Sequence, residues 1–270
     1  MSHLLDQALH LEPLGADRFR GATHPGYANM VGPYGGMTAA VMLQAALVHP
    51  ARLGVPLSLT VNYAAPVADG AFDIEARPLR TNRSTQHWLM LLMQDGEVAA
   101  SATALFGVRR PTWSAGEAEP PADVPPAAAI APARAGSFLP PWVSRYDMRF
   151  VRGALPADFD ETEQPDSQTT LWVRDEPPRP WDFAALAAVI DCFVPRVFLR
   201  RRRRTPAGTV TMTVDFHADE AWLHEQGDRP VLGTARALAF HDGFFDQAAE
   251  IWSDDGRLLA SSLQLVYFKG

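Results

Sequence analysis

Residues 95–106 (DGEVAASATALF) and residues 255–266 (DGRLLASSLQLV) are two copies of one pattern. Each copy opens with Asp-Gly, carries Ala-Ser at the same place and is otherwise mostly apolar. An internal repeat of this kind predicts a chain built from two similar units. One position differs in kind, because Gln264 stands where the first copy has Ala104. A polar residue present in only one copy indicates that the second copy has a requirement that the first does not share.

The composition of the 270-residue chain limits the classes of protein to which it can belong. A net charge of −7 disfavours a general nucleic-acid-binding role, so we expect no nucleic-acid partner. The single cysteine, Cys192, excludes an internal disulfide and agrees with a reducing compartment. The N-terminus lacks the basic start and apolar run of a signal peptide, and no stretch approaches the roughly 20 apolar residues that a membrane span needs. We therefore expect a soluble cytoplasmic protein.

A proline-rich segment divides the chain near its middle. Residues 111–141 contain repeated prolines, which are excluded from helix interiors and central strands, so we expect an extended connector there. This division predicts an N-terminal unit over residues 1–110 and a C-terminal unit over residues 142–270. A connector in this position is what a duplicated unit requires.

Each unit is predicted to combine one long apolar helix with a set of strands. The helices are expected over Met37–Val48 and over Trp181–Phe193, because both runs are almost wholly apolar. Asp-Gly pairs supply turn residues between neighbouring strands. An antiparallel sheet could wrap around each helix, and the two units should pack side by side because one helix cannot cover such a sheet. The predicted strands are Leu57–Ala64, Ala71–Leu79, Gln86–Gln94, Val98–Val108, Asp147–Arg152, Thr169–Arg174, Thr209–His217, Val231–Phe240, Phe244–Trp252 and Leu258–Phe268.

The strands that follow the two helices can be aligned residue by residue. Residues 60–63 (TVNY) match residues 213–216 (TVDF), and the same offset places Thr209 opposite Pro56. Taken alone, a threonine at the start of a strand is explained by its strand propensity. A strand glutamine such as Gln264 is most simply explained by a side chain that points to solvent. An argument that Thr209 and Gln264 have a chemical role therefore requires a further polar residue that strand propensity or solvent exposure does not explain.

The helix alignment supplies that residue. Residues 39–41 (AAV) match residues 187–189 (AAV), which places Asp191 opposite Leu43. Aspartate has a mediocre helix propensity and is costly to bury without partners, so a solvated face explains Asp191 poorly within an apolar helix. Three polar residues of the second unit thus face apolar or inert counterparts in the first: Asp191, Thr209 and Gln264.

With these residues identified, the chain resembles the acyl-CoA thioesterases with a double hotdog fold, specifically those like bacterial acyl-CoA thioesterase II. The resemblance covers most of the chain outside the connector. In the first unit it rests on residues 19–21 (FRG) and 31–36 (VGPYGG), and in the second on residues 190–191 (ID), 209–217 (TVTMTVDFH) and 260–264 (ASSLQ). The implied fold is α+β, with two antiparallel sheets that each wrap around a long apolar helix and join into one continuous sheet.

The resemblance implies hydrolysis of acyl-CoA thioesters to the free acid and CoA. In the family, an Asp on the second helix, a Thr on the following strand and a Gln on the last strand hold the hydrolytic water, and these map onto Asp191, Thr209 and Gln264. A carboxylate can orient or deprotonate a water, while an amide and a hydroxyl fix it by hydrogen bonds. We further expect the backbone N–H groups of Gly35 and Gly36, before the first helix, to bind the oxyanion. A tight turn needed only for packing is the alternative for these glycines.

An arginine run follows the second helix. Arg200, Arg201 and Arg202 are candidate ligands of the CoA phosphates, whereas a solvated loop is the commoner explanation of such a run. Cys192 is expected to be a buried packing residue, because no cysteine-hydrolase signature accompanies it. We find no metal-ligand spacing, phosphate-binding loop, dinucleotide fingerprint or Gly-x-Ser-x-Gly element, so neither a metal nor a cofactor is expected.

Two other functions remain open at this point. His24 and Pro33 resemble part of the His-x-x-x-Gly-x-x-x-x-Pro pattern of hotdog dehydratases, which use a His from one unit and an Asp, here Asp191, from the other; Ala28, however, replaces the expected glycine. The second alternative is a non-catalytic hotdog protein that binds acyl thioesters. Related proteins often pair, so a homo-oligomer is a further expectation. The residues do not determine the acyl chain length.

Overall fold

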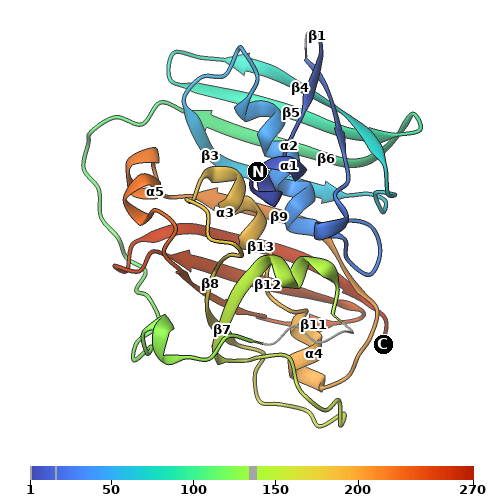
Figure 1. Cartoon of the computed structure of the whole chain (residues 1–270), viewed down its shortest axis with the longest axis vertical. Helices are drawn as coiled ribbons and strands as arrows, with labels where there is room; N and C mark the ends of the chain where they lie inside the picture. The colour runs from blue at the N-terminus through green and yellow to red at the C-terminus, as the bar shows by residue number, and fades with distance from the viewer. Residues whose placement is uncertain (1, 16, 134–138) are drawn as a thin grey trace.

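A single antiparallel sheet organises the molecule (Figure 1). The computed structural model describes residues 2–15, 17–133 and 139–270. The strand order is β1-β2-β4-β5-β6-β3-β9-β13-β12-β10-β8-β7, and β11 pairs with β12. The strands are β1 (Glu12–Gly15), β2 (Arg18–Ala22), β3 (Val55–Tyr63), β4 (Ala71–Thr81), β5 (Thr85–Gln94), β6 (Glu97–Gly107), β7 (Tyr146–Arg152), β8 (Thr169–Asp175), β9 (Ala207–Phe216), β10 (Val231–Arg236), β11 (Phe240–His241), β12 (Phe244–Trp252) and β13 (Leu258–Phe268).

The sheet consists of two halves with the same internal order. On one side of its centre the order outward is β3, β6, β5, β4, and on the other it is β9, β13, β12, β10. The seam is the antiparallel pair β3–β9, in which Thr60 faces Thr213 and their hydroxyl oxygens lie 2.9 Å apart. These are the residues that the sequence alignment equated, so the duplicated unit is confirmed as one continuous double hotdog sheet.

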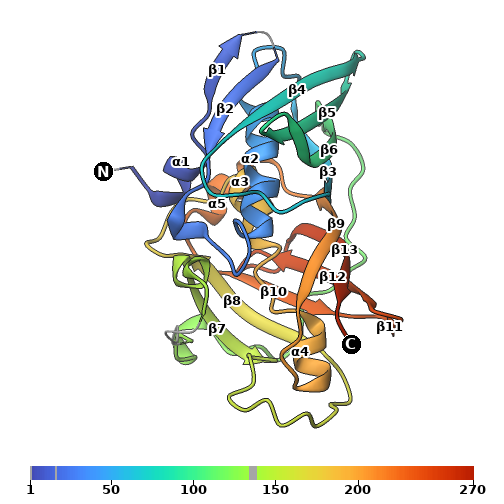
Figure 2. The ribbon, with the colours of Figure 1, turned by 90° about the vertical axis from the view of Figure 1, so that its right-hand side faces the viewer.

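Two helices lie against the same face of this sheet and pack on each other (Figure 2). The first, α2 (Gly35–Leu47), is buried over almost its entire length, as its uniformly apolar sequence requires. The second, α3 (Phe183–Val189), is buried throughout. Shorter helices are α1 (Leu4–Ala8), α4 (Arg196–Arg201) and α5 (Glu220–Gln226), together with the 3₁₀ turns η1 (Pro25–Tyr27), η2 (Ala127–Ala129) and η3 (Pro141–Arg145). Within the described ranges, no helix combines the length and apolarity that crossing a membrane would require.

The hairpin turns predicted at Asp95-Gly96 and Asp242-Gly243 are confirmed. Asp95 and Gly96 both have positive φ angles, 51° and 84°, and connect β5 to β6 in two residues. Asp242 and Gly243 repeat this geometry between β11 and β12, with φ angles of 44° and 83°. Two successive positive φ angles match the twist of the flanking strands, which is why Asp-Gly is favoured there.

The second helix is shorter than the sequence predicted. We expected a helix over Trp181–Phe193, but it spans Phe183–Val189. Its start is fixed by the Asp182 side chain, which accepts a hydrogen bond from the Ala185 N–H at 2.8 Å. At its end the N–H groups of Asp191 and Cys192 each bond to the carbonyl three residues earlier, which tightens the last turn. Asp191 therefore lies in a turn beyond the helix rather than inside it.

The predicted strand Val231–Phe240 is interrupted. Its residues form β10 as far as Arg236 and resume in β11 at Phe240. Between the two strands, the carboxylate of Asp246 accepts hydrogen bonds from the N–H groups of Leu238 and Ala239, at 3.1 and 2.8 Å. A side chain thus replaces the strand partner that these groups would otherwise need.

The proline-rich segment runs along the outside of the C-terminal half. The indole N–H of Trp172 on β8 donates to the Pro125 carbonyl at 2.9 Å, and Arg149 on β7 donates to the carbonyls of Ala127 and Ile130. The only regular element of residues 111–133 is the 3₁₀ turn η2. Residues 134–138 of the predicted connector lie outside the described residues.

Candidate active site at the junction of the two halves

The three polar residues isolated from the repeat form one hydrogen-bonded row. Thr209 on β9 donates from its hydroxyl to Oε1 of Gln264 at 3.1 Å. Gln264 on β13 in turn donates from Nε2 to Oδ1 of Asp191 at 2.9 Å. Gln264 is 2% exposed, so its side chain points inward toward the helices and not to solvent. The row therefore presents a carboxylate whose orientation is fixed by an amide that is itself fixed by a hydroxyl.

Asp191 faces the start of α2, which belongs to the other half. A Cβ built on Gly35 would lie 2.8 Å from Oδ2 of Asp191, so only a glycine leaves room for the carboxylate. Burial raises the pKa of Asp191 to about 6, while the Gln264 amide and the backbone N–H of Gly36 oppose that rise. The carboxylate is thus ionised at neutral pH and has a pKa suited to accepting a proton.

Two tyrosines that sequence reasoning missed connect the halves at this point. Tyr34, the N-cap of α2, donates from its hydroxyl to the Ala188 carbonyl at 2.6 Å, near the end of α3. Tyr63, at the end of β3, donates to the Gly35 carbonyl at 3.0 Å. Gly36 lies so close to α3 that a Cβ on it would be 2.2 Å from the Ala188 oxygen. These contacts hold the start of α2 against the turn that carries Asp191.

A second buried glutamine lies beside the row. Gln247 on β12 is 3% exposed and is the direct cross-strand neighbour of Gln264, so the two side chains share the inner face of the sheet. Among the described residues, the Gln247 side chain has no hydrogen-bond partner, and its amide atoms are not completely enclosed. The repeat could have indicated this residue, because Trp88 takes the same place beside Ala104 in the first half.

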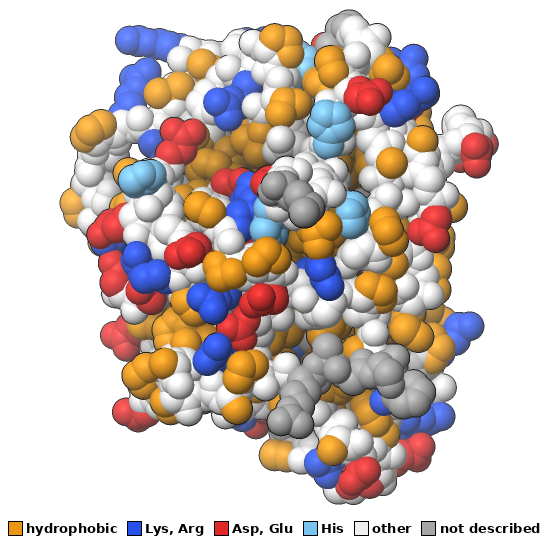
Figure 3. All heavy atoms as spheres, viewed as in Figure 1, with side chains coloured by type: hydrophobic (Ala, Val, Ile, Leu, Met, Phe, Trp, Pro, Cys, Tyr) orange, Lys and Arg blue, Asp and Glu red, His pale blue; other side chains and the backbone are white. Residues whose placement is uncertain are grey.

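The arginine run pairs with an acidic segment that the sequence analysis did not consider. Arg200 lies 2.7 Å from Glu163 and Arg202 lies 2.9 Å from Asp160. Arg201 is exposed at the end of α4, and the ion pairs of the described chain do not include it. On the face shown in Figure 3, acidic and basic side chains are likewise interspersed and form no patch of one sign.

His24 occupies a capping position. Its Nδ1 accepts a hydrogen bond from the Gly26 N–H at 3.0 Å, at the start of η1. Burial and the nearby Arg145 lower its pKa, which favours the neutral imidazole. Among the described residues, its polar contacts do not include Asp191, with which the dehydratase alternative would pair it. Cys192 is buried, as expected, and burial raises the pKa of its thiol.

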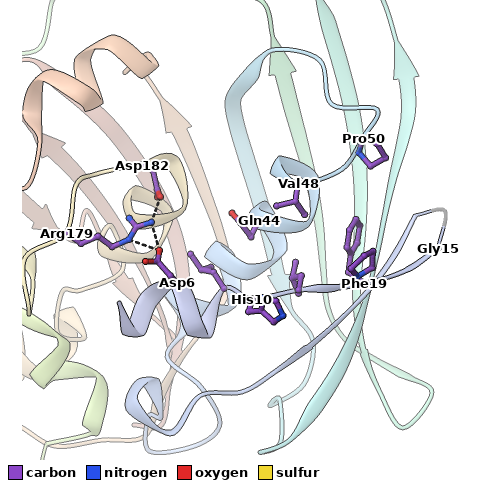
Figure 4. Close-up of a pocket in the computed structure, with 12 residues that line it drawn as sticks. Asp6, His10, Gly15, Phe19, Gln44, Val48, Pro50, Arg179 and Asp182 are labelled. Carbon is purple, nitrogen blue, oxygen red and sulfur yellow. Dashed lines mark hydrogen bonds and ion pairs between the residues drawn. The ribbon is translucent and has the colours of Figure 1, made fainter. Parts of the chain in front are cut away.

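A cavity of about 620 Å³ lies at the other end of the helix pair (Figure 4). It is bordered by Gln44 and Val48 from the end of α2, and by a cluster in which Arg179 bonds to both Asp6 and Asp182. Because Asp182 caps the start of α3 and Asp191 follows its end, this cavity and the carboxylate row are separated by the length of α3. The lining of this cavity therefore does not include the row.

A second buried carboxylate lies outside the row. Asp175, at the end of β8, is 1% exposed, and neither of its oxygens has a hydrogen-bond partner among the described residues. Burial raises its pKa to about 7, partly opposed by Arg179. No cluster of three or more His, Cys, Asp or Glu side chains that could hold a metal ion occurs in the described ranges.

The fold and the row at the junction of its halves agree with the family to which the chain belongs. A model of the acyl-CoA thioesterase C-terminal domain matches residues 121–268, and a model of the acyl-CoA thioesterase N-terminal domain matches residues 24–107. The chain is a member of the acyl-CoA thioesterase family. No curated protein matches it.

Solved structures give the same fold. A conserved protein of unknown function with a hotdog fold, from Alicyclobacillus acidocaldarius, is 52% identical with a TM-score of 0.94, covering 100% of this chain and 99% of that one. A putative thioesterase II from Thermobifida fusca is 22% identical with a TM-score of 0.83, covering 98% and 97%. An acyl-CoA thioesterase II from Mycobacterium marinum is 20% identical with a TM-score of 0.77, covering 98% of each chain. The latter two likenesses concern the fold alone.

Proposed function

We propose that this protein hydrolyses acyl-CoA thioesters to the free acid and CoA, with a water held by Asp191, Thr209 and Gln264. The observation that carries the proposal is the row Thr209–Gln264–Asp191, with its carboxylate against the start of a helix from the other half. Family membership supports thioester hydrolysis in general. The identity of the catalytic residues is the new part of the proposal.

The reaction needs one base and a binding site for negative charge. The water oxygen forms a bond to the thioester carbonyl carbon while its proton passes to the Asp191 carboxylate. When the tetrahedral intermediate collapses, the carbon–sulfur bond breaks, and the proton is returned to the thiolate of CoA. Positioning and proton transfer suffice, so no covalent intermediate on the protein is required.

The start of α2 is the proposed oxyanion site, made by Gly35 and Gly36. The N–H groups of Met37 and Thr38 bond to the Tyr34 carbonyl, and that of Gly36 faces Asp191. The Gly35 N–H makes no hydrogen bond among the described residues, which makes it the better placed of the two to donate to the oxyanion. The positive end of the helix dipole adds to this effect.

The direct test is release of free thiol from a panel of acyl-CoA esters of different chain length. Wild-type protein should release CoA, and Asp191→Ala should lose most turnover while keeping its circular dichroism spectrum. Wild-type activity in that variant would contradict the assignment of the base. Binding of CoA esters without release of thiol would instead support the non-catalytic alternative, and addition of water to an enoyl thioester would support the dehydratase alternative.

The arginines Arg200, Arg201 and Arg202 remain the proposed ligands of the CoA phosphates. Because Arg200 and Arg202 already face carboxylates, Arg201 is the residue whose charge is least compensated. Arg201→Glu should raise the KM for acyl-CoA but not for the matching acyl-pantetheine, which lacks the nucleotide phosphates. An equal change in both KM values would contradict the proposed phosphate contact.

We also propose that a second copy of the chain covers the outer face of the sheet behind the row. Leu263, Leu265 and Tyr267 alternate with the inward residues of β13 and are 54%, 40% and 40% exposed, and Phe244 beside them is 43% exposed. Such a contiguous apolar patch commonly indicates an interaction site. Light scattering should give a dimer or larger assembly, and the double change Leu263→Glu, Leu265→Glu should give a monomer. A monomeric wild-type protein would contradict this proposal.

A further inference from the structure

The first residue of each hotdog helix has an equivalent contact, but the two contacts differ chemically. In the second half, Phe183 at the start of α3 packs edge to face against Phe216 of β9, with ring centroids 5.8 Å apart. In the first half the equivalent residues are Gly35 and Tyr63, by the offsets that align the two repeats. Here the tyrosine hydroxyl donates to the glycine carbonyl at 3.0 Å. A purely apolar contact has been replaced by a hydrogen bond.

The bonded carbonyl belongs to a peptide group that also faces the proposed base. The carbonyl of Gly35 and the N–H of Gly36 are the two ends of one planar peptide unit. Tyr63 bonds to one end, and the other end faces the Asp191 carboxylate and lowers its pKa. The missing side chain of Gly35 leaves room for Asp191, with 2.8 Å between Oδ2 and the position of a Cβ. The glycine and the tyrosine therefore act on the same carboxylate.

We propose that Tyr63 is a positioning residue, whose hydroxyl holds and polarises the Gly35–Gly36 peptide so that its N–H stabilises the ionised carboxylate of Asp191. This inference rests on the proposed function. It specifies how the first half assists a base that belongs to the second half. Hydrogen bonds in series strengthen one another, by about 10–30% per bond in condensed-phase estimates. An OH···O=C–N–H···carboxylate series is such an arrangement.

The surroundings of Asp191 make the proposal testable by titration. The titratable side chains that face it are Tyr34, Tyr63, Tyr146 and Cys192. Burial raises the pKa of each of these four groups above its ordinary value, so all of them stay neutral between pH 5 and 9. Gln264 and the Gly36 N–H do not titrate. A change of charge among these groups across that range is therefore a change at Asp191.

The experiment compares Tyr63→Phe with Tyr146→Phe. Phenylalanine is the residue at the equivalent place in the second half, so Tyr63→Phe removes the hydroxyl while keeping the ring. Tyr146 is a buried tyrosine near the site whose hydroxyl has no hydrogen-bond partner among the described residues, so its loss is the matched control. In Tyr63→Phe the acid limb of kcat/KM should move up by about 0.5 pH unit, so that activity is about 3-fold lower at pH 5 and converges with wild type near pH 8.5. Tyr146→Phe should leave the profile unchanged.

A second readout does not depend on activity. The carboxyl carbon of Asp191, assigned by its loss in Asp191→Asn, can be titrated by NMR in wild-type protein and in Tyr63→Phe, and the same upward shift is expected. Superimposed titrations, or a loss of activity equal at every pH, would overturn the positioning role. An inactive wild-type protein would defeat the proposed function, yet the NMR titration would still decide whether Tyr63 acts on Asp191.

Discussion

The inner faces of the two halves differ where their strands correspond. In the first half, Trp88 on β5 pairs with Ala104 on β6, and both are buried. In the second half, Gln247 on β12 pairs with Gln264 on β13, and both are again buried. One half fills this space with an indole and a methyl group, the other with two amides. Since a buried amide needs hydrogen-bond partners to offset the cost of its burial, the second half has a polar requirement that the first half shows to be unnecessary for the fold.

The two hotdog helices, α2 and α3, also differ at both of their ends. α2 has 13 residues and α3 has 7, so the second helix ends six residues earlier (13 − 7). Leu43 is therefore buried inside α2, whereas its counterpart Asp191 lies in a turn where its carboxylate can reach the other half. At the opposite ends, α3 begins with a phenylalanine and α2 with a glycine. The candidate site combines the unlike ends, namely the start of the first helix and the turn after the second.

The strongest way to test this comparison is to neutralise the carboxylate. Asp191→Asn keeps the shape but cannot accept the proton, so kcat/KM should fall about 10³-fold, within the range typical of general bases. Because folding raises the pKa of Asp191 to about 6 from 3.8, the native state favours the protonated form, and stability falls as the pH rises between these values. Asn removes that cost, so at pH 8 the variant should be more stable, by at most about 3 kcal/mol.

Asp175→Asn is the matched control for that change. It also replaces a buried acid whose pKa is raised, to about 7, but lies outside the row. It should raise Tm at pH 8 while kcat stays within about 2-fold of wild type. Thiol release and thermal denaturation at pH 5 and pH 8 measure both effects. A full loss of activity in Asp175→Asn would show that the site extends beyond the row.

Replacing Gln264 by alanine, the residue at the equivalent position of the first half, tests the role of the amide. Gln264→Ala leaves Asp191 without its donor and Thr209 without its acceptor, so activity should fall about 10²-fold. The lost hydrogen bond also raises the pKa of Asp191 further, so the acid limb of the pH profile should move to higher pH. Leu263→Ala, the outward neighbour on the same strand, should leave the profile unchanged. Identical profiles for the two variants would contradict a role for the amide.

Substituting the two glycines separates chemistry from packing. The new Cβ of Gly35→Ala would lie 2.8 Å from the Asp191 carboxylate, which must move, so activity should fall about tenfold with little change in Tm. That of Gly36→Ala would lie 2.2 Å from a backbone oxygen of α3, so Tm should fall substantially. Kinetics and thermal denaturation of both variants check the contrast. Equal losses of stability would show that both glycines serve packing alone.

The smallest effect is expected at the second amide. Gln247→Leu is nearly isosteric and removes the polar group beside Gln264, so kcat/KM should fall about 3-fold, while stability should rise because a buried amide has been removed. Activity and Tm measured on the same preparation test both directions. If stability falls instead, the amide has a structural hydrogen bond that the comparison of the halves does not reveal.

Much of the fold could be predicted because it depends on local patterns. Apolar runs without glycine or proline predicted α2, and Asp-Gly pairs predicted the turns at Asp95 and Asp242. The early end of α3 could not be predicted, because the residues beyond Val189, apart from Asp191, are as apolar as those within the helix. The gap in the strand after Arg236 depends on Asp246, which is eight residues from Leu238 along the chain. The alternation of apolar and polar residues therefore could not predict this gap.

The candidate site was predictable to a different degree. The repeat alone isolated Asp191, Thr209 and Gln264, because duplication supplies an internal reference against which a polar residue is conspicuous. Tyr34, Tyr63 and the acidic partners of the arginine run were missed, since a tyrosine hydroxyl or a loop carboxylate has no signature until its partner is known. Gln247 could have been found by aligning β5 with β12.

The sequence by itself determined that this protein is a duplicated unit with one polar copy, because repeats, hydrophobic periodicity and turn residues act over a few neighbouring positions. Only the tertiary structure decided that the carboxylate of one half meets the helix start of the other. That meeting depends on contacts between residues far apart in the chain, such as Tyr34 with Ala188, and on close approach at two glycines. Such contacts form only when both hotdog units fold against each other.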